Sequence, residues 1–338
     1  MSGAPIELTV SEDDDGQRLD RWLKREAKHI PYVLVQKLVR KGAIRIDGKR
    51  CKPDARIAAG QKIKLPAVEN HQSAPGERKK GVSEKDAAFI RSLVIYDDGD
   101  VLAINKPCGL AVQGGTSTKR HVAGMLEALK NKKGVVPRIV HRLDKDTSGV
   151  LLLARSAEVA RALGEALKKR EVKKIYWALV SPPPKEFSAT IKAPLLKAAH
   201  GSDKEKIHID EAGKYAETEY EVLERAHEAA AFVAFWPRTG RTHQIRAHAA
   251  YIGAPVLGDR KYASKIEALP QHAQKGEIDL GGVDIAPRLH LHAQRIICRH
   301  PTKKGQRLDI KADLPPELKK SWRALGFNPT YNEDPFPA

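Results

Sequence analysis

The feature that most constrains the fold is a break in composition between residues 67 and 84. Apolar side chains nearly vanish there, while Asn, Gln, Ser, Pro, Gly and Lys accumulate. Such a segment cannot bury apolar surface and is typical of a linker, so the chain on either side must fold separately. We predict an N-terminal extension (1–15), a small domain (16–66), a linker (67–84), a large domain (85–325) and a C-terminal tail (326–338) that is mobile or draped over the surface.

The small domain carries most of the net positive charge of the chain. Residues 16–66 hold fifteen Lys and Arg but four Asp and Glu, whereas all 338 residues have a formal net charge of +18. Apolar residues at helical spacing predict two short helices near residues 19–23 and 35–39. A strand over 43–46 then turns at Asp47-Gly48, and another strand covers 62–65. The pattern predicts a compact α/β unit with a basic face.

A charge surplus of this size points to a polyanionic partner, because neutralising phosphates releases condensed counterions. No apolar run approaches the roughly 18 residues of a membrane span, and the N-terminus lacks the pattern of a signal peptide. The three cysteines are too widely spaced for a disulfide framework or a zinc site. We therefore expect a cytoplasmic protein that binds nucleic acid through Arg18, Arg21, Lys37, Arg40, Lys41 and Arg45.

The large domain is predicted to be α+β with a largely antiparallel sheet. Residues 92–96 and 101–104 flank a turn at Asp97-Asp98-Gly99-Asp100, and 216–223 and 230–236 predict a second antiparallel pair. Strands are also predicted over 150–154 and 174–180, and helices over 156–170 and 242–252. Strands dominate and helices occur singly between them, which favours this fold class.

The run HRLDKDTSG at residues 141–149 comes directly before an apolar strand. A polar loop delivered by a rigid strand is a common place for catalytic groups. Asp, Thr, Ser and Gly are also ordinary turn formers, and local composition alone favours a solvated turn. Two further segments shift the balance toward a functional site.

The first of these, WPRTGRTHQIRAH at residues 236–248, places three Arg and two His at a loop-to-helix junction. Arg241 and Arg246 can hold a carboxylate from another loop in its ionised form, or the segment can be a phosphate-binding patch without chemistry. The second, KKIYWALV at residues 173–180, begins a strand. Tyr176 can be a core residue, or it can stack on a base while the neighbouring lysines contact the RNA backbone.

Together the runs HRLDKDTSG, KKIYWALV and GRTHQIRAH resemble, in this order, the three signature segments of the RluA-type pseudouridine synthases. Residues 16–66 resemble the S4 RNA-binding domain that many of these enzymes carry. The segment NKPCGLAV at 105–112, followed by Gly114 and Gly115, resembles another family segment, with Cys108 where Ser is commoner. Residues 111–115 and APLLK at 193–197 are most similar to the RluC branch, which modifies large-subunit (23S) ribosomal RNA. The resemblance spans residues 16–320.

The resemblance implies roles for individual residues. Asp144, rather than Asp146, matches the catalytic aspartate of the family. Tyr176 matches the active-site tyrosine, and Arg246 matches the arginine that pairs with the catalytic aspartate. Arg142 matches the residue that enters the RNA helix in place of the extruded uridine. Further expected contacts to RNA are His141, Arg241 and His243.

The implied reaction isomerises uridine to pseudouridine: uracil is detached from C1′, turned, and reattached through C5. No group is gained or lost, so we expect no cofactor and no metal. A duplexed uridine must first be flipped out, at a cost of a few kcal/mol, which Arg142 in the gap and Tyr176 stacked on the base offset in part. The expected partner is large-subunit ribosomal RNA, and nothing in the sequence demands more than a monomer.

Two other interpretations use the same residues. One is a non-catalytic, RNA-binding ribosome assembly factor built on an inactive synthase scaffold, although an intact Asp, Tyr and Arg set argues against it. The other is a metal-dependent nuclease that uses His290 and His292 with His243 and His248. Alternating histidines in a strand are more often structural, and no carboxylate has ligand-like spacing to them.

Overall fold

The computed structural model describes residues 5–27, 30, 32–67, 81–114, 118, 120–198, 207–263, 271, 275 and 277–336. The chain divides into two compact units, residues 1–81 and 82–338. Most of the expected linker (68–80) and the start of the expected N-terminal extension (1–4) lie outside the described residues.

The small unit consists of a four-stranded sheet with two helices, and its sheet has the strand order β1-β4-β2-β3. The predicted helices and hairpin are confirmed: Asp47 and Gly48 both have positive φ, as a two-residue hairpin turn requires. Leu19 and Trp22 from the first helix pack against Ile63 in one core. The elements are β1 (Ile6–Thr9), η1 (Glu12–Asp14), α1 (Leu19–Glu26), α2 (Tyr32–Lys41), β2 (Arg45–Ile46), β3 (Lys49–Arg50) and β4 (Lys62–Leu65).

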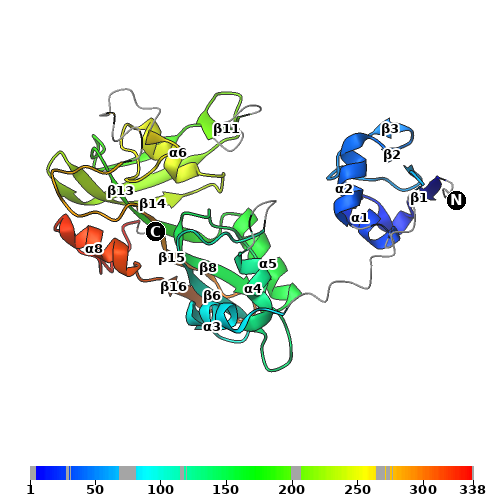
Figure 1. Cartoon of the computed structure of the whole chain (residues 1–338), viewed down its shortest axis with the longest axis horizontal. Helices are drawn as coiled ribbons and strands as arrows, with labels where there is room; N and C mark the ends of the chain where they lie inside the picture. Colours follow the sequence, from blue (N-terminus) through cyan, green and yellow to red (C-terminus); the bar gives the residue numbers. More distant parts are fainter. Residues whose placement is uncertain are drawn as a thin grey trace. The chain divides into compact units, whose positions relative to one another are not determined.

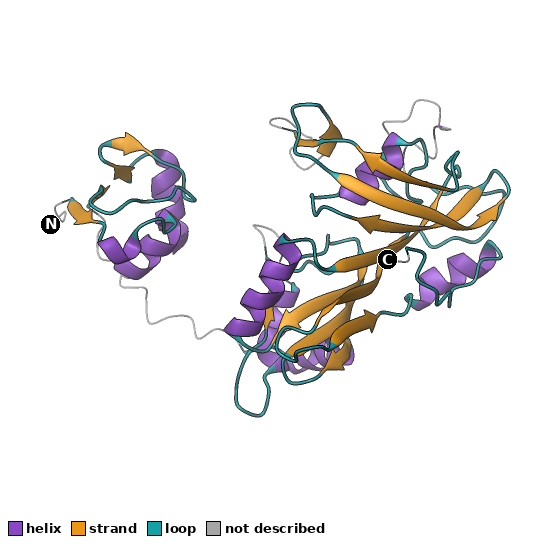
Figure 2. Cartoon of the chain, turned by 180° about the vertical axis from the view of Figure 1, so that it is seen from behind, coloured by secondary structure: helices purple, strands orange, loops and turns teal. Residues whose placement is uncertain are grey.

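The large unit is built on a ten-stranded sheet, and Figure 2 shows that strands form its body, with helices packed on them. Its first half contains α3 (Glu84–Ser92), β5 (Val94–Asp97), β6 (Val101–Lys106), α4 (Val122–Met125), η2 (Leu126–Leu129), β7 (Arg138–Ile139), β8 (Ser148–Ala154) and α5 (Ala157–Lys168). The rest contains β9 (Lys173–Val180), β10 (Ser188–Lys192), β11 (Leu195–Lys197), β12 (Ile207–Ile209), β13 (Glu217–Ala226), β14 (Ala230–Pro237), α6 (Gln244–Tyr251), β15 (Leu291–Arg299), β16 (Arg307–Lys311) and α8 (Pro316–Ala324).

The main path of this sheet is β10-β13-β14-β9-β15-β8-β6-β5, with β16 paired to β15 and β7 paired to β8. Among the described strands, β15 and β8 form the single parallel pair. The two predicted hairpins, β5–β6 and β13–β14, are confirmed as antiparallel pairs. The fold is therefore α+β with a mostly antiparallel sheet, as the sequence predicts.

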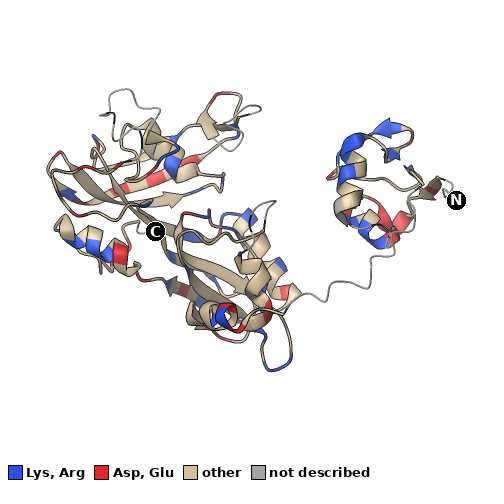
Figure 3. Cartoon of the chain, viewed as in Figure 1, with Lys and Arg blue, Asp and Glu red and all other residues tan. Residues whose placement is uncertain are grey.

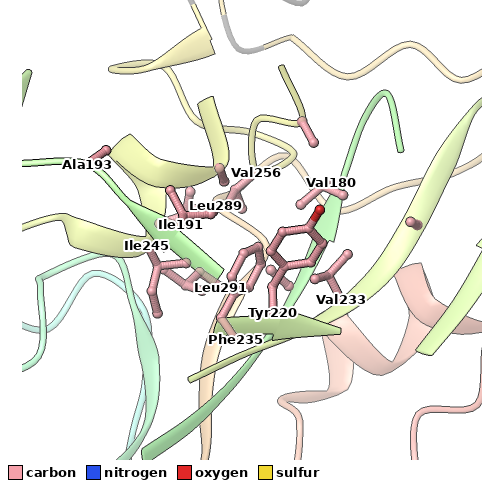
Figure 4. Packing of buried hydrophobic residues seen from close by; sticks show 14 residues of the cluster. Val180, Ile191, Ala193, Tyr220, Val233, Phe235, Ile245, Val256, Leu289 and Leu291 are labelled. Carbon is pink, nitrogen blue, oxygen red and sulfur yellow. The ribbon is translucent and has the colours of Figure 1, made fainter. Parts of the chain in front are cut away.

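Alternation along β14 and β9 gives this part of the sheet two different buried faces. Val233 and Phe235 of β14 face Ile245 of α6, in the cluster shown in Figure 4. Phe232 of β14 and Trp177 of β9 face α8 instead. Figure 1 shows α6 and α8 on opposite sides of these strands. Each fully buried Ile or Phe contributes roughly 1.5–3 kcal/mol to this packing.

Of the two alternatives predicted for the C-terminal tail, mobile or draped over the surface, the structure agrees with the second and also buries part of the tail. Phe327 and Phe336 are buried in the same cluster as α8. The ammonium of Lys173 donates to both carboxylate oxygens of Asp334, at 2.8 and 2.7 Å, and also to the carbonyl of Phe336. Aromatic residues spaced along the tail thus dock it on the sheet, and this outweighs the Pro and Asn content that suggested disorder. Residues 337 and 338 lie outside the described part.

None of the helices in the described part of the chain is long and apolar enough to cross a membrane.

Candidate active site

The loop that carries Asp144 is held from inside the protein. Leu143 is buried in the core between the helices and the sheet. The ammonium of Lys106 is fully buried and donates to the carbonyls of Pro107, Leu110 and Lys145 at 2.9, 2.9 and 3.1 Å. A carbonyl cage of this kind fixes the backbone one residue after Asp144, so the position of the carboxylate is set by packing rather than by solvent.

Strand β9, which follows β8 and α5 in the chain, brings Tyr176 to the pocket that Asp144 also lines. Tyr176 is half-buried and packs against the two clusters on either side of the loop. Burial, together with the negative charge of Asp144, raises the pKa of Tyr176 well above its usual range. The phenol therefore stays neutral in the pocket that it shares with Asp144.

The loop at residues 237–243 owes its shape to one buried amide, that of Gln244. Its Oε1 accepts from the Thr239 hydroxyl at 2.7 Å and from the Arg241 backbone N–H at 3.0 Å. Its Nε2 donates to the Glu217 carbonyl and the Thr218 hydroxyl, both at 2.8 Å. The amide is fully satisfied and ties the loop to β13. This locked loop places His243, which has a left-handed backbone with φ of 51°, at the start of α6.

The expected ion pair between Arg246 and Asp144 is not made. Arg246 forms a bidentate pair with Asp259 instead, with both nitrogen–oxygen distances at 2.6 Å. The side chains of Arg246 and Asp259 are 6% and 0% exposed, so a carboxylate that deep requires a cation. Burial acts to lower the pKa of Arg246, but the hydrogen bonds and charge of Asp259 raise it overall, and Asp144 adds to this rise. Arg246 thus acts on Asp144 through its field.

The basic side chain that lies against Asp144 is the imidazole of His243, whose Nε2 is 3.8 Å from the carboxylate Oδ2. The other ring nitrogen, Nδ1, is 2.9 Å from the hydroxyl of Tyr262, which also accepts the Ile207 backbone N–H at 3.1 Å. Burial lowers the pKa of His243, although Asp144 opposes this. Burial also raises the pKa of Tyr262 to about 12. His243 is therefore a neutral ring held in one orientation beside Asp144.

These segments line a pocket of about 540 Å³. Asp144, Tyr176, His243 and Arg246 all line it, which brings together the three segments that the sequence singled out. Among the described residues, its walls contain one carboxylate, that of Asp144, and seven Lys and Arg: Arg142, Lys168, Arg170, Lys174, Arg238, Arg241 and Arg246. A concave site with this balance attracts an anionic ligand and leaves a single acid to act on it.

The remaining residues that were expected at RNA differ in position. Arg142 and Arg241 are exposed at the pocket, and Arg241 also donates to the Tyr215 carbonyl at 3.1 Å. His141 lines the pocket too, but its Nε2 accepts the Leu152 backbone N–H at 2.9 Å. Burial and the nearby Lys174 lower the pKa of His141 to about 4. One ring nitrogen of His141 is therefore committed to holding the loop on β8.

The histidines considered as metal ligands are used by the fold. His290 bonds to the Ser321 hydroxyl, and His292 lies between the Ser148 hydroxyl and the Ala312 carbonyl, all at 3.0 Å. His248 lies between the Thr218 hydroxyl and the Ala193 carbonyl, at 2.9 and 3.0 Å. Within the described residues, no group of three or more His, Cys, Asp or Glu has an arrangement that could hold a metal ion.

On the small unit, Lys and Arg gather over α2 and the β2–β3 hairpin, coloured blue in Figure 3. Lys37, Arg40 and Lys41 are exposed and lie three and four residues apart, on one side of α2. Arg45 is different, because its guanidinium donates to the carbonyls of Gly42 and Gly48 at 3.2 Å. Arg18 is also engaged, in an ion pair with Asp20 at 2.8 Å.

A sheet of this topology, with an Asp-bearing loop in a basic pocket and a separate basic unit, defines a class of RNA-modifying enzyme. Residues 100–251 match the RNA pseudouridylate synthase family, and residues 17–63 match the S4 domain. The chain is 37% identical over 323 residues to ribosomal large subunit pseudouridine synthase C of Pasteurella multocida, covering 94% of this chain and 93% of that protein. The chain belongs to the RNA pseudouridine synthase family and carries an N-terminal S4 domain.

Other relatives also match this chain over most of its length. The synthase of the same name from Escherichia coli K12 is 34% identical over 321 residues, covering 94% of this chain and 96% of its own. Among solved structures, human RNA pseudouridylate synthase domain containing 4 superposes with a TM-score of 0.59 at 26% identity. That match covers 72% of this chain and 97% of the human chain. The enzyme class expected from the sequence, an isomerase that forms pseudouridine in RNA, is confirmed.

Reasoning from the sequence missed Asp259, Tyr262 and Lys106. Asp259 and Tyr262 lie in the Gly-containing run LGDRKY (257–262), which has the composition of an ordinary loop. Lys106 ends strand β6, and a lysine two residues after the apolar run Val101–Ile104 was a signal of internal use. All three act on the site by holding its loops.

Proposed function

We propose that this enzyme converts uridine to pseudouridine in large-subunit (23S) ribosomal RNA, with Asp144 as the carboxylate that acts on the glycosidic bond. The observation that carries the proposal is the pocket, whose lining in the described part of the chain has Asp144 as its one acid among seven Lys and Arg. The relatives named ribosomal large subunit pseudouridine synthase C cover nearly the whole chain, which supports this class of RNA.

In the proposed reaction the N1–C1′ bond breaks and the C5–C1′ bond forms. N1 gains a proton and C5 loses its hydrogen, so no co-reactant is consumed. A carboxylate can bond to the reacting carbon or stabilise an oxocarbenium-like C1′, as at other glycosidic centres. Tyr176 lines the same pocket as Asp144 and is assigned to stack on the flipped uracil. Arg246, held by Asp259, supplies positive potential at the Asp144 carboxylate.

The RNA contacts are assigned to two surfaces. Arg142 and Arg241, exposed at the pocket, are proposed to bind the RNA around the extruded uridine, with Arg142 entering the gap in the helix. Arg21 and the α2 side chains Lys37, Arg40 and Lys41 are proposed to hold the RNA through its phosphates. We assign a monomer acting in the cytoplasm; sedimentation of the purified protein at micromolar concentration tests the monomer.

The test replaces Asp144 by Asn and measures tritium released from C5 of labelled uridine in ribosomal RNA. We expect activity to fall by at least about 1000-fold, as when a nucleophile is removed, while RNA binding and the thermal unfolding midpoint stay near those of the native enzyme. The control is Asp146→Asn, because Asp146 is an exposed neighbour in the same loop. Equal activity in both variants would show that Asp144 is not the catalytic carboxylate.

Mapping of pseudouridines in ribosomal RNA, from cells with and without the protein, tests the class of substrate. We expect specific large-subunit uridines to remain unmodified when the protein is absent. If binding to ribosomal RNA persisted but no pseudouridine depended on the native protein, a non-catalytic assembly factor would replace the enzyme.

A further inference from the structure

Lys173 and Lys174 are neighbours in the sequence, but β9 sends them to opposite faces of the sheet. Lys173 lies on the α8 side, where Asp334 and Phe336 of the tail bind its ammonium. Lys174 faces the other way and lines the pocket, on the same side as Tyr176. Lys173 therefore stabilises the docked C-terminal tail, whereas Lys174 lies at the pocket.

Lys174 is the less expected of the two. Its side chain is half-buried, and no carboxylate, carbonyl or hydroxyl among the described residues bonds to its ammonium. Burial, with no compensating negative charge, lowers the pKa of Lys174. A half-buried cation without a counter-ion costs free energy in the free enzyme. An anionic group on a bound ligand would supply the missing counter-ion of this ammonium.

The location of the Lys174 ammonium indicates which part of a bound nucleotide it would contact. A Cβ built at Gly240 would come within 3.9 Å of its Nζ, so the ammonium faces the backbone of the 237–243 loop. Its charge also acts on His141, on the wall that leads to Asp144. Lys174 and Tyr176 are two residues apart on one strand, which separates their backbones by roughly 7 Å. The sugar and phosphate of one nucleotide span such a gap.

We propose that Lys174 binds the phosphodiester next to the extruded uridine, on the 5′ or 3′ side, and so sets how deeply the nucleotide enters the pocket. This inference rests on the proposed function, because it takes Asp144 and Tyr176 as the place where the nucleoside is held. Arg170 and Arg238 line the same pocket and extend the positive surface away from Asp144. Lys174 is a positioning residue that contacts the substrate backbone, away from the reacting atoms.

The first experiment compares Lys174→Met and Lys174→Arg with Lys173→Met as the matched control. A lost charge-assisted contact to phosphate should lower kcat/KM of Lys174→Met by about tenfold to 100-fold, chiefly through KM. The kcat/KM of Lys174→Arg should be closer to that of the native enzyme, because this variant keeps the positive charge. Lys173→Met should lower the thermal midpoint but leave kcat/KM near native, because it breaks the contact with the tail.

The thermal midpoint of Lys174→Met separates a ligand contact from a structural role. Removing an unpaired, half-buried ammonium should leave the midpoint unchanged or raise it. A fall in the midpoint like that of Lys173→Met, with kcat/KM unchanged, would assign Lys174 to the fold and overturn the proposal.

The second experiment identifies the phosphate. Short synthetic RNAs carry a neutral methylphosphonate at either linkage next to the target uridine. With the native enzyme, one of the two RNAs should lose about as much kcat/KM as Lys174→Met loses on unmodified RNA. Combining that RNA with Lys174→Met should add little further loss, because both changes remove the same contact. Additive losses with both RNAs would contradict the proposal.

The two levels of proposal can fail separately. If the native enzyme released no tritium from any ribosomal RNA fragment, the proposed function would fail. Filter binding would then still test the phosphate contact. The affinity of the native enzyme for these RNAs would be compared with that of Lys174→Met, and the contact requires weaker binding by the variant. If the native enzyme were active and Lys174→Met equally so, the phosphate contact alone would fail.

Discussion

Among single residues, Asp259 and Arg246 show how the site keeps a cation in place. The carboxylate of Asp259 accepts two guanidinium N–H groups at 2.6 Å and also the backbone N–H of Lys261 at 2.9 Å. Arg246 is therefore committed to a buried partner in the free enzyme. Its charge reaches Asp144 without forming a direct ion pair, so Asp144 stays free to meet the substrate.

At this scale we predict that Asp259→Asn costs about 3–5 kcal/mol in the free energy of unfolding, because it leaves a buried guanidinium without its counter-ion. The control is Asp309→Asn, which breaks the bidentate pair of Asp309 with Arg295 on the surface. Asp309 is 41% exposed, so we expect a loss of at most about 1 kcal/mol. Urea unfolding of both variants checks this, and equal losses would contradict it.

At the scale of elements, the site depends on the contact between β8 and β15. The Asp144 loop ends at β8, and β8 pairs in parallel with β15 at Ser148 and Gly149. The Ser148 hydroxyl bonds to His292 of β15 and accepts from Arg288, both at 3.0 Å. The loop is thereby fixed to a strand more than 140 residues away, on which the β9 strand of Tyr176 also pairs.

Gly149 permits this contact, and its replacement gives a second prediction. A Cβ at Gly149 would lie 2.1 Å from the carbonyl oxygen of Ala293, and its φ is +114°. Gly149→Ala should therefore cost about 2–6 kcal/mol through overlap and backbone strain together. Gly164→Ala, in α5 with no atom within 4 Å of the new Cβ, should raise stability by up to about 1 kcal/mol. Similar unfolding midpoints for the two variants would argue against this role of Gly149.

At the scale of the whole molecule, charge is divided between binding and structure. The α2 side chains Lys37, Arg40 and Lys41 are exposed and suited to phosphate, whereas the large unit buries histidines in its interior. His290 and His292 are fully buried, and burial lowers the pKa of each to about 4. Their hydrogen bonds connect β15 with α8 and with the Asp144 loop, so their protonation state matters for the whole large unit.

This gives a prediction for the dependence of stability on pH. The folded-state pKa values lie below the ordinary value of 6.5, so the unfolded chain binds protons more readily. Stability should therefore be fully present above about pH 6.5 and fall as the pH drops toward 4, by up to about 3 kcal/mol for each histidine. Urea unfolding at pH 7.5, 6 and 5 measures the loss. A free energy of unfolding that does not change between pH 7.5 and 5 would show that these rings titrate normally.

The local features of this protein could be predicted from its sequence. Periodicity located part of the strands and helices, among them β13, β14 and α5, because alternation and helical spacing are properties of short windows. Charge separated the basic small unit from the rest of the chain. The run HRLDKDTSG was singled out with Asp144, and the structure brings it into one pocket with Tyr176 and Arg246. The catalytic and RNA-binding roles of these residues stay predictions.

What only the tertiary structure decided is which group meets which. Arg246 binds Asp259 rather than Asp144, the tail docks through Phe336, and Lys173 and Lys174 part to opposite faces. The physical reason is that each of these outcomes depends on what packs against a residue from a distant segment. The sequence by itself determined the elements and the chemical groups of this protein, whereas long-range packing determined their partners.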